Sequence, residues 1–323
     1  IRQFLANGYK VKHNSDSVSG EIVVINTCGF IGDAQEESIN MILKIVEAKK
    51  ARRIGQVYVM GCLTERFMDE LKQEIPEVDG YYGKFNWKNL LTDLGKAYHH
   101  DPLGGNRSIT TPKHYAYMKI SEGCNRSCSY CAIPLITGKH QSRPMEELIA
   151  EAESLVAGGV KEIQLIAQDL TFYGLDIYKK NRLADLLERL SDIRGLEWLR
   201  LHYAYPADFP KEILRVMRER ENICNYLDIA LQHISDPMLR AMRRRVTKAE
   251  TYDLLRYMRE EVPGIHLRTT LMTGHPGETE QDFEELLQFV RDIRFDRMGA
   301  FVYSHETGTY AHDKYQDDIP LAV

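Results

Sequence analysis

The stretch Tyr115-Ala-Tyr-Met-Lys-Ile-Ser-Glu-Gly-Cys-Asn-Arg-Ser-Cys-Ser-Tyr-Cys131 joins a run of β-forming residues to three closely spaced cysteines. These have the pattern C-x3-C-x2-C and make up half of the six cysteines of the chain. Soft thiolate ligands select iron-sulfur clusters or zinc, and closed sites of either kind use four ligands. Because the nearest histidines, His114 and His140, lie ten residues before and nine residues after the motif, we expect an open position for an exogenous ligand. A disulfide knot is the alternative, but a chain of 323 residues does not need such cross-links.

Strand and helix patterns alternate on both sides of these cysteines. The run Tyr115–Ser121 is β-rich, and Pro144–Val156 has the period of an amphipathic helix with proline at its start. Further strands are predicted at Glu162–Ala167, Trp198–Ala204, Tyr226–Leu231, Ile265–Met272 and Arg297–Tyr303, with helices at about Leu183–Asp192, Lys211–Arg220, Lys248–Glu261 and Glu280–Ile293. Six strands that alternate with helices predict a parallel α/β sheet. The cysteines then follow the C-terminal end of its first strand.

The cysteine loop resembles that of the radical S-adenosylmethionine (SAM) enzymes, which carry an aromatic residue, here Tyr130, just before the last cysteine. In that family the three cysteines, here Cys124, Cys128 and Cys131, bind a 4Fe-4S cluster whose open iron is chelated by SAM, and the aromatic residue packs against the adenine. The resemblance implies a partial (β/α)6 barrel with its chemistry at the C-terminal strand ends. It also implies an electron donor such as flavodoxin or ferredoxin, because an electron from the cluster cleaves SAM to a 5′-deoxyadenosyl radical.

Composition limits the class of protein. The chain has 43% hydrophobic and 28% charged residues, a formal net charge of −5 and no run of eighteen apolar residues. These values predict a soluble, cytoplasmic protein that does not span a membrane. The negative charge does not favour nucleic acid as the primary partner. The short basic run Arg243–Arg245 is interpreted as a solvated helix end, with a nucleic-acid contact as the alternative.

A break in the periodicity divides the chain. Proline and glycines interrupt the pattern at Tyr98–Asn106, so residues 98–113 are predicted to link an N-terminal domain, residues 1–97, to a radical SAM domain, residues 114–323. In the first domain the predicted strands are Glu21–Asn26, Gln56–Met60 and Val78–Tyr82, and the predicted helices are Asp33–Lys50, Thr64–Glu74 and Trp87–Lys96. This alternation predicts a smaller parallel α/β domain. Cys28 and Cys62 follow its first two strands, so their thiols are expected at one edge of the sheet.

This first domain resembles that of the methylthiotransferases in the runs Ile25–Phe30 and Met60–Arg66. There, three cysteines carry an auxiliary 4Fe-4S cluster, so Cys28 and Cys62 become candidate ligands and two clusters are implied; a pair of buried core thiols is the alternative. The family's third cysteine lies in a Gly-Cys-x-Lys-Asn motif before the first helix, which these 323 residues lack. Because Ile1–Gly8 has the pattern of a helix end without a preceding strand, we expect that a strand is missing and that the auxiliary cluster is incomplete. The C-terminal TRAM β-barrel of such proteins is likewise expected to be absent.

Several motifs resemble the methylthiotransferase branch that modifies a ribosomal protein. They are Cys131–His140, Gln164–Gly174, Leu201–Pro206 and Asp228–Ser235, and the resemblance covers essentially the whole chain. It implies addition of a methylthio group to the β-carbon of an aspartate in the twelfth protein of the small ribosomal subunit, with one SAM as radical source and a second as methyl donor. A tRNA adenosine methylthiotransferase and a non-catalytic iron-sulfur protein are the alternatives.

Polar residues at the predicted strand ends are the candidates for holding SAM. The resemblance directs Gln168, Gln232 and Arg268 at the ribose and methionine, with packing inside the barrel as the alternative for each. Gly274 and Gly277 lie in a turn that resembles the family's glycine-containing turn beside the adenine, where glycines allow close approach of the backbone. The family's Gly-Gly-Glu motif is replaced by Ala-Gln-Asp, and the isolated Cys224 is predicted to be structural.

Overall fold

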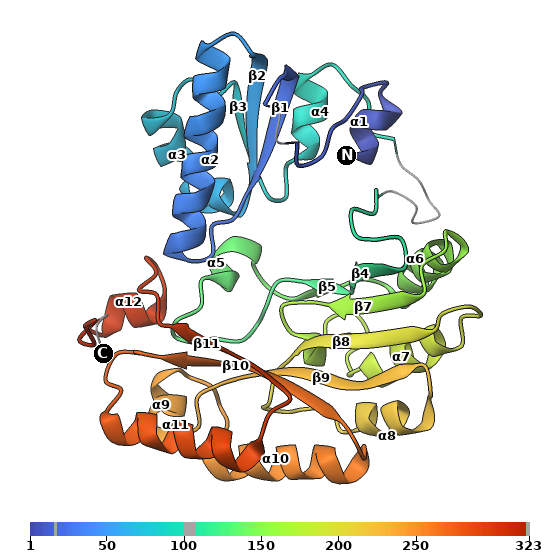
Figure 1. Ribbon diagram of the computed structural model, residues 1–323, viewed down its shortest axis with the longest axis vertical. Coiled ribbons are helices and arrows are strands. Elements are labelled where there is room, and N and C mark those ends of the chain that lie inside the picture. The colour runs from blue at the N-terminus through green and yellow to red at the C-terminus, as the bar shows by residue number, and fades with distance from the viewer. Residues whose placement is uncertain (16–17, 100–106, 321–323) are drawn as a thin grey trace. The chain divides into compact units, whose positions relative to one another are not determined.

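The computed structural model describes residues 1–15, 18–99 and 107–320, which form two compact units (Figure 1). The described residues up to 99 belong to the first unit, and residues 109–134 and 138–320 belong to the second. Each unit has a parallel sheet of its own. The predicted linker, residues 98–113, lies partly outside the described residues, so the proposed domain boundaries stay a prediction. No helix in the described ranges is long and apolar enough to cross a membrane.

The first unit is built on a parallel sheet whose described strands pair in the order β1-β2-β3. These strands are β1 (Gly20–Thr27), β2 (Ile54–Gly61) and β3 (Gly80–Gly83), and the helices are α1 (Arg2–Ala6), α2 (Gly32–Lys50), α3 (Cys62–Glu74) and α4 (Lys88–Asp93). Ile42 of α2 packs in the same core as Val57 and Val59 of β2, and all three exclude solvent completely. The predicted alternation of strands and helices is therefore confirmed for this unit.

Strand β3 begins two residues later than predicted, and Asp79 explains the difference. Its carboxylate accepts a hydrogen bond from the Val57 amide at 2.7 Å, and its own amide donates to the Val57 carbonyl at 2.8 Å. A side chain thus takes the place of a main-chain carbonyl, so regular pairing of β3 with β2 starts only at Gly80.

The second unit is built on a larger parallel sheet. Its described strands pair in the order β4-β7-β8-β9-β10-β11, with bounds β4 (Tyr115–Lys119), β7 (Glu162–Ile166), β8 (Trp198–Ala204), β9 (Ile223–Gln232), β10 (His266–Thr273) and β11 (Arg297–Val302). The helices that lie wholly in this unit are α6 (Met145–Ala157), α7 (Leu183–Ser191), α8 (Glu212–Glu219), α9 (Asp236–Ala241), α10 (Lys248–Glu261), α11 (Glu280–Ile293) and α12 (Tyr310–Lys314). Helix α5 (Ile133–Thr137) begins in this unit, and its last three residues are assigned to the first. The edge strands β4 and β11 do not pair with each other within the described chain. The sheet is an open, partial (β/α)6 barrel, as predicted.

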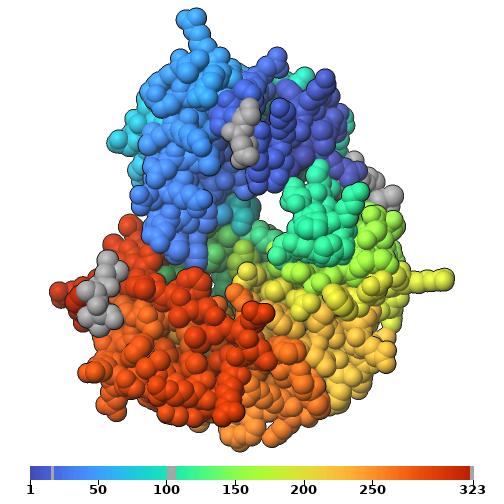
Figure 2. Space-filling view, in the orientation of Figure 1, coloured from blue at the N-terminus to red at the C-terminus, as the bar shows by residue number. Residues whose placement is uncertain are grey.

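The two faces of this sheet differ in chemistry because side chains alternate along each strand. Leu201 of β8 and Ile229 of β9 belong to the apolar core, together with residues of the covering helices. Helices α10 and α11 lie side by side on this covered face (Figure 1), and the orange segments around them form one continuous surface in the space-filling view (Figure 2). The other face carries Arg200, His202 and Asp228, which are buried or half-buried. This polar face is the concave side of the partial barrel.

Several short elements were not expected from the sequence. They are α5, α9, α12, the 3-10 turn Leu170–Phe172, and the two-residue strands β5 (Ser121–Glu122) and β6 (Gln141–Ser142). Segments of six residues or fewer span at most about two helical turns, so they carry no resolvable periodicity. Their formation depends on contacts with other segments of the chain rather than on their own periodicity.

Candidate active site

The three closely spaced cysteines lie on one loop that is closed at its base. Strands β5 and β6 pair antiparallel there, with Glu122 opposite Gln141. Gly123 then turns the chain with a φ of +80°, and a Cβ at this position would lie 2.2 Å from the Lys139 carbonyl oxygen. No other residue fits at Gly123 without displacing backbone. The cysteine loop is therefore a tied loop at the C-terminal end of β4.

Two of the three sulfurs accept hydrogen bonds from N–H groups. The Arg126 amide donates to Cys124 Sγ at 3.4 Å, and Arg244 Nη1 donates to Cys128 Sγ at 3.2 Å. Burial raises the pKa of Cys124 to about 11 and that of Cys131 to about 12. Without a metal, these two thiols hold their protons at neutral pH. Because the thiolate is the ligand form, metal binding must release protons here.

Tyr130 lies between the arginine and a buried histidine. Its hydroxyl accepts a hydrogen bond from Arg244 Nη1 at 3.2 Å, and its ring makes an edge contact with His275 at 6.5 Å between centroids. Burial raises the pKa of Tyr130 and lowers that of His275. His275 Nδ1 lies 3.1 Å from the Pro276 carbonyl oxygen, which can only accept, so Nδ1 carries the proton and Nε2 accepts from the Ser129 hydroxyl at 3.2 Å. These contacts fix the aromatic ring at the end of the cysteine loop.

The predicted glycine turn follows β10. Gly274 and Gly277 have φ values of +76° and +79°, which favour glycine. The Gly274 amide donates to the Glu278 carboxylate, whose other oxygen lies 2.9 Å from His233 Nε2, and the Gly277 amide donates to Asp318 at 3.0 Å. A Cβ at Gly277 would meet nothing within 4 Å. Hydrogen bonds from its own amides to carboxylates thus hold the turn, and open space remains beside Gly277.

Two of the predicted polar residues also lie at the C-terminal ends of strands. Gln168 follows β7, and its Nε2 donates to Glu122 Oε1 beside the cysteine loop at 2.6 Å, while its buried Oε1 has no partner among the described residues. Gln232 ends β9 with a φ of +72°, at an irregularity in the pairing with β10. The structure thus places both glutamines on the edge of the sheet that carries the cysteine loop.

Arg268 differs from the glutamines in its position and contacts. It lies five residues before the end of β10 and forms an ion pair with the buried Asp228 of the neighbouring strand. His202 Nδ1 lies 3.6 Å from the same carboxylate. These contacts are those of a residue packed inside the barrel, which is the alternative role for Arg268.

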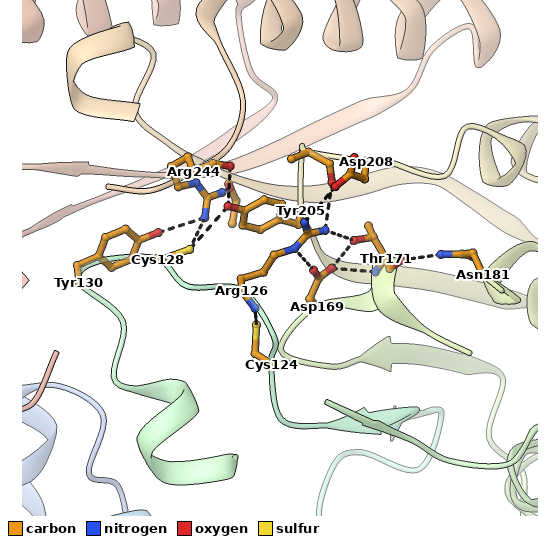
Figure 3. A network of polar contacts seen from close by, with 12 residues as sticks. Cys124, Arg126, Cys128, Tyr130, Asp169, Thr171, Asn181, Tyr205, Asp208 and Arg244 are labelled. Atoms are coloured by element: carbon orange, nitrogen blue, oxygen red, sulfur yellow. Dashed lines mark hydrogen bonds and ion pairs between the residues drawn. The ribbon is translucent and has the colours of Figure 1, made fainter. Parts of the chain in front are cut away.

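Two arginines near the loop were not among the predicted site residues (Figure 3). Arg126 forms an ion pair with Asp169 at 2.9 Å, and its guanidinium also donates to Thr171 and to the Ala207 carbonyl. Asp169 is 1% exposed. The signal in the sequence was the position of Arg126 inside the cysteine motif itself.

The interpretation of Arg243–Arg245 as a solvated helix end is wrong for its central residue. Arg243 and Arg245 are exposed, but Arg244 is only 2% exposed. Arg243 and Arg245 have φ values of +57° and +53°, which is a backbone conformation that no sequence pattern indicated. The chain after α9 therefore directs Arg244 inward, where it also donates to the Ala230 carbonyl.

Cys28 and Cys62 lie on neighbouring turns at the edge of the first unit's sheet. Thr27 and Gly61, the residues before them, are register partners at the ends of β1 and β2. A Cβ on Gly29 would lie 2.7 Å from the Cys62 carbonyl oxygen, so the two turns are in close contact. Cys28 is exposed and Cys62 is half-buried. The expected position at one sheet edge is what the structure has.

The donor set of the cysteine loop fits an iron-sulfur cluster. It offers three soft thiols, and two buried polar atoms around it, Gln168 Oε1 and Arg244 Nε, lack a partner among the described residues. Buried polar groups normally have partners, so such atoms point to a bound group. No three His, Cys, Asp or Glu side chains in the described ranges are arranged around a single metal ion. Ligands of a cluster bind separate irons, so they need not meet at one point.

Comparison with known proteins agrees with this fold. The profile of the Radical SAM superfamily matches residues 118–290, and that of Uncharacterized protein family UPF0004 matches residues 1–83. The radical SAM methyltransferase TsrM from Kitasatospora setae, solved with cobalamin and a [4Fe-4S] cluster, superposes with a TM-score of 0.64 at 17% identity over 88% of this chain and 64% of that chain. The cobalamin-dependent radical SAM enzyme OxsB gives 0.60 at 11% identity over 90% and 46%. At these identities the likeness concerns the fold alone; the superfamily profile shows that the chain belongs to the radical SAM superfamily.

Similar proteins narrow the assignment. The ribosomal protein uS12 methylthiotransferase RimO of Porphyromonas gingivalis is 72% identical over 323 residues, which are 100% of this chain and 74% of that protein. Proteins of the same name from Parabacteroides distasonis and Flavobacterium johnsoniae are 68% identical over 323 residues and 53% identical over 319, covering 74% and 72% of their lengths and 100% and 98% of this chain. Within the superfamily, the chain belongs to the RimO family of ribosomal protein uS12 methylthiotransferases. The family predicted from the sequence is confirmed.

Proposed function

We propose that this protein is a radical SAM methylthiotransferase that modifies ribosomal protein uS12 of the small subunit. The observation that carries the proposal is the tied cysteine loop at the C-terminal edge of an open (β/α)6 sheet, in a chain of the RimO family. Family membership supports the substrate, and the target atom that we propose is the β-carbon of an aspartate. A C–H bond at such a carbon is not acidic enough for a general base, so a radical route is the chemistry that suits it.

Cys124, Cys128 and Cys131 would hold the 4Fe-4S cluster. When bound and reduced, the cluster supplies the electron that cleaves SAM. Tyr130 presents an aromatic face beside the loop, where it would pack against the adenine, and the backbone at Gly274 and Gly277 would approach the same group closely. Gln168 and Gln232 at the sheet edge would bind the polar part of SAM, whereas Arg268 is the weaker candidate because Asp228 already engages it.

Cys28 and Cys62 would be two of the three cysteine ligands of a second, auxiliary 4Fe-4S cluster. The register of β1 with β2, which brings the two turns together, supports this role. A flavodoxin or ferredoxin would act as electron donor, and the enzyme would work in the cytoplasm. The proposed domain division is 1–97 for the auxiliary site and 114–323 for the radical site.

Anaerobic reconstitution with iron and sulfide, followed by reduction with dithionite in the presence of SAM, tests the proposal. Formation of 5′-deoxyadenosine would establish the radical enzyme, and mass spectrometry of uS12 and of tRNA added in parallel would identify the substrate. With the auxiliary cysteine set complete, methylthiolation of uS12 alone is the expected result. Methylthiolation of tRNA alone would replace the substrate, and a cluster-loaded chain that forms no deoxyadenosine would make it a non-catalytic iron-sulfur protein.

A further inference from the structure

Two arginines pack against one tyrosine beside the cysteine loop. The Cζ atoms of Arg126 and Arg244 lie 4.0 Å and 4.1 Å from the centroid of the Tyr205 ring (Figure 3). The Tyr205 hydroxyl donates to the Arg244 carbonyl at 2.7 Å and lies 3.8 Å from Cys128 Sγ. A guanidinium over an aromatic face is attracted to the ring. This Arg126–Tyr205–Arg244 stack therefore holds two cationic groups in fixed positions next to the thiols.

The two guanidinium groups differ in how their charge is balanced. Arg126 has the buried carboxylate of Asp169 at 2.9 Å, and the exposed Asp208 lies 3.5 Å away. Arg244 has no carboxylate partner within the described residues, and its guanidinium hydrogen bonds go to Cys128 Sγ, the Tyr130 hydroxyl and the Ala230 carbonyl. Arginine does not lose its proton in proteins. The charge of Arg126 is thus neutralised locally, and that of Arg244 is not.

A buried cation without a counter-ion is costly, so the 2% exposed Arg244 needs an anion close by. Two groups that can become anionic lie 3.2 Å from Arg244 Nη1, the Cys128 thiol and the Tyr130 hydroxyl. Burial raises the pKa of Tyr130, so the hydroxyl keeps its proton, and the thiol is the group that a bound metal converts to an anion. A cluster bound through three thiolates supplies that negative charge at the sulfur which Arg244 Nη1 already contacts at 3.2 Å. The position of Arg244 is therefore explained by an anionic group held on the loop.

We propose that Arg244 raises the reduction potential of the cluster on the cysteine loop. Arg126 and Tyr205 act as positioning residues that hold the Arg244 guanidinium against Cys128. The inference rests on the proposed function, because it takes Cys124, Cys128 and Cys131 as the cluster ligands. Reduction adds one electron to the cluster, from its 2+ to its 1+ core charge, without breaking a bond. A fixed positive charge and an N–H donated to a ligand sulfur both favour the more reduced form.

Arg244→Met is the direct test, because methionine keeps an unbranched side chain of similar reach and removes the charge and the donors. Arg245→Met is the matched control, since it removes the same charge from the next residue, which is exposed. The midpoint potential of the reconstituted full chain is measured by dithionite titration followed by electron paramagnetic resonance, with iron, sulfide and thermal unfolding checked for each protein. The Arg244→Met midpoint should move to a more negative potential, and that of Arg245→Met should stay at the wild-type value.

Arg244→Lys keeps the charge but loses the planar fork that contacts Cys128, Tyr130 and Ala230 together. The midpoint potential of Arg244→Lys should lie between those of wild type and Arg244→Met. If Arg244→Met binds no cluster, the lysine variant alone tests the inference, and its midpoint potential should be more negative than that of Arg245→Met. An Arg244→Met protein with full iron content and the wild-type potential would overturn the inference, as would a lysine variant that matches Arg245→Met. A wild-type chain that binds no cluster at all would instead overturn the proposed function.

Discussion

The two cysteine sites of this chain are built in different ways. Cys124, Cys128 and Cys131 lie within eight residues on one tied loop, whereas Cys28 and Cys62 are thirty-four residues apart and lie on neighbouring turns because β1 and β2 pair in register. Local spacing alone gathers the first set. The second set exists only once a parallel sheet has formed, so its geometry depends on tertiary structure.

The surroundings of the two sites differ as well. The loop sulfurs accept N–H donors, one of them from a buried cation without a carboxylate partner in the described part of the chain. At the sheet edge the backbone of Cys28 is held by a side chain: the Ser38 hydroxyl donates to the Cys28 carbonyl at 3.0 Å and accepts from the Cys28 amide at 3.0 Å. Hydrogen-bond donors and a buried positive charge thus surround the loop site, whereas hydrogen bonds to the backbone fix the conformation of the edge site.

The largest expected effect is at the loop. Cys128→Ala should abolish reductive cleavage of SAM, because two remaining thiolates do not anchor a cluster that needs three, while the fold should persist since the loop lies outside the apolar core. The measurement is 5′-deoxyadenosine by chromatography, with circular dichroism for the fold. Cys224→Ala, a change at a thiol in β9, should retain wild-type cleavage. Deoxyadenosine from the Cys128→Ala protein would remove this loop from the radical site.

A change at the edge site should separate the two sites. With Cys28 and Cys62 both replaced by serine, the loop should still hold about four irons and deoxyadenosine should still form, because the proposed ligands of its 4Fe-4S cluster all follow Gly123. In a protein that carries all three auxiliary cysteines, the same double change should abolish transfer of the methylthio group to uS12. Iron analysis and mass spectrometry of uS12 check the two parts. Equal loss of deoxyadenosine and methylthiolation would show that the sites do not function independently.

Tyr130→Ala should have a smaller effect, on SAM affinity rather than on iron content. Aromatic stacking contributes about 0.5–1.5 kcal/mol beyond area burial, which corresponds to roughly two- to twelvefold weaker binding. Calorimetric titration of the reconstituted protein with SAM measures this change. Tyr130→Phe keeps the ring and loses only the hydroxyl contact with Arg244, so it should bind SAM as the wild type does. Unchanged affinity in the alanine variant would exclude Tyr130 from the adenine contact.

The smallest expected effect concerns pH. Burial lowers the pKa of His275 below its ordinary value of 6.5, so the folded form resists protonation where the unfolded chain accepts it. The neutral His275 side chain therefore makes its full contribution to the free energy of unfolding above about pH 6.5, and this contribution is lost as the pH falls below that value. Glu278 and Asp318 oppose this shift, and His233 adds to it. Chemical denaturation of the metal-free protein at pH 7.5 and 5.5 measures the free energy of unfolding at each pH. The decrease between the two pH values should be smaller in His275→Gln than in wild type, and equal decreases would contradict the lowered pKa of His275.

The elements that the sequence predicted well are those with long patterns. The six strands of the larger sheet and the helices between them were placed to within a few residues because each repeats its period over several residues. The cysteine triad was found because its spacing is local. The burial of Arg244 follows from the left-handed conformation of its two neighbours, which no sequence pattern indicates. The charge balance that distinguishes it from Arg126 depends on Asp169, which lies more than forty residues after Arg126. Such features require the folded chain.

The pairing of β5 with β6 has a consequence for the order in which the site forms. Glu122 and Gln141 are nineteen residues apart, so the loop closes through local contacts, which form faster than distant ones. Arg244 follows the last cysteine of the loop by more than one hundred residues. Since chains emerge from the ribosome N-terminus first, the thiols gather before their arginine has been synthesised. The loop that gathers the three thiols can thus close on a nascent chain while the arginine beside Cys128 is still unmade.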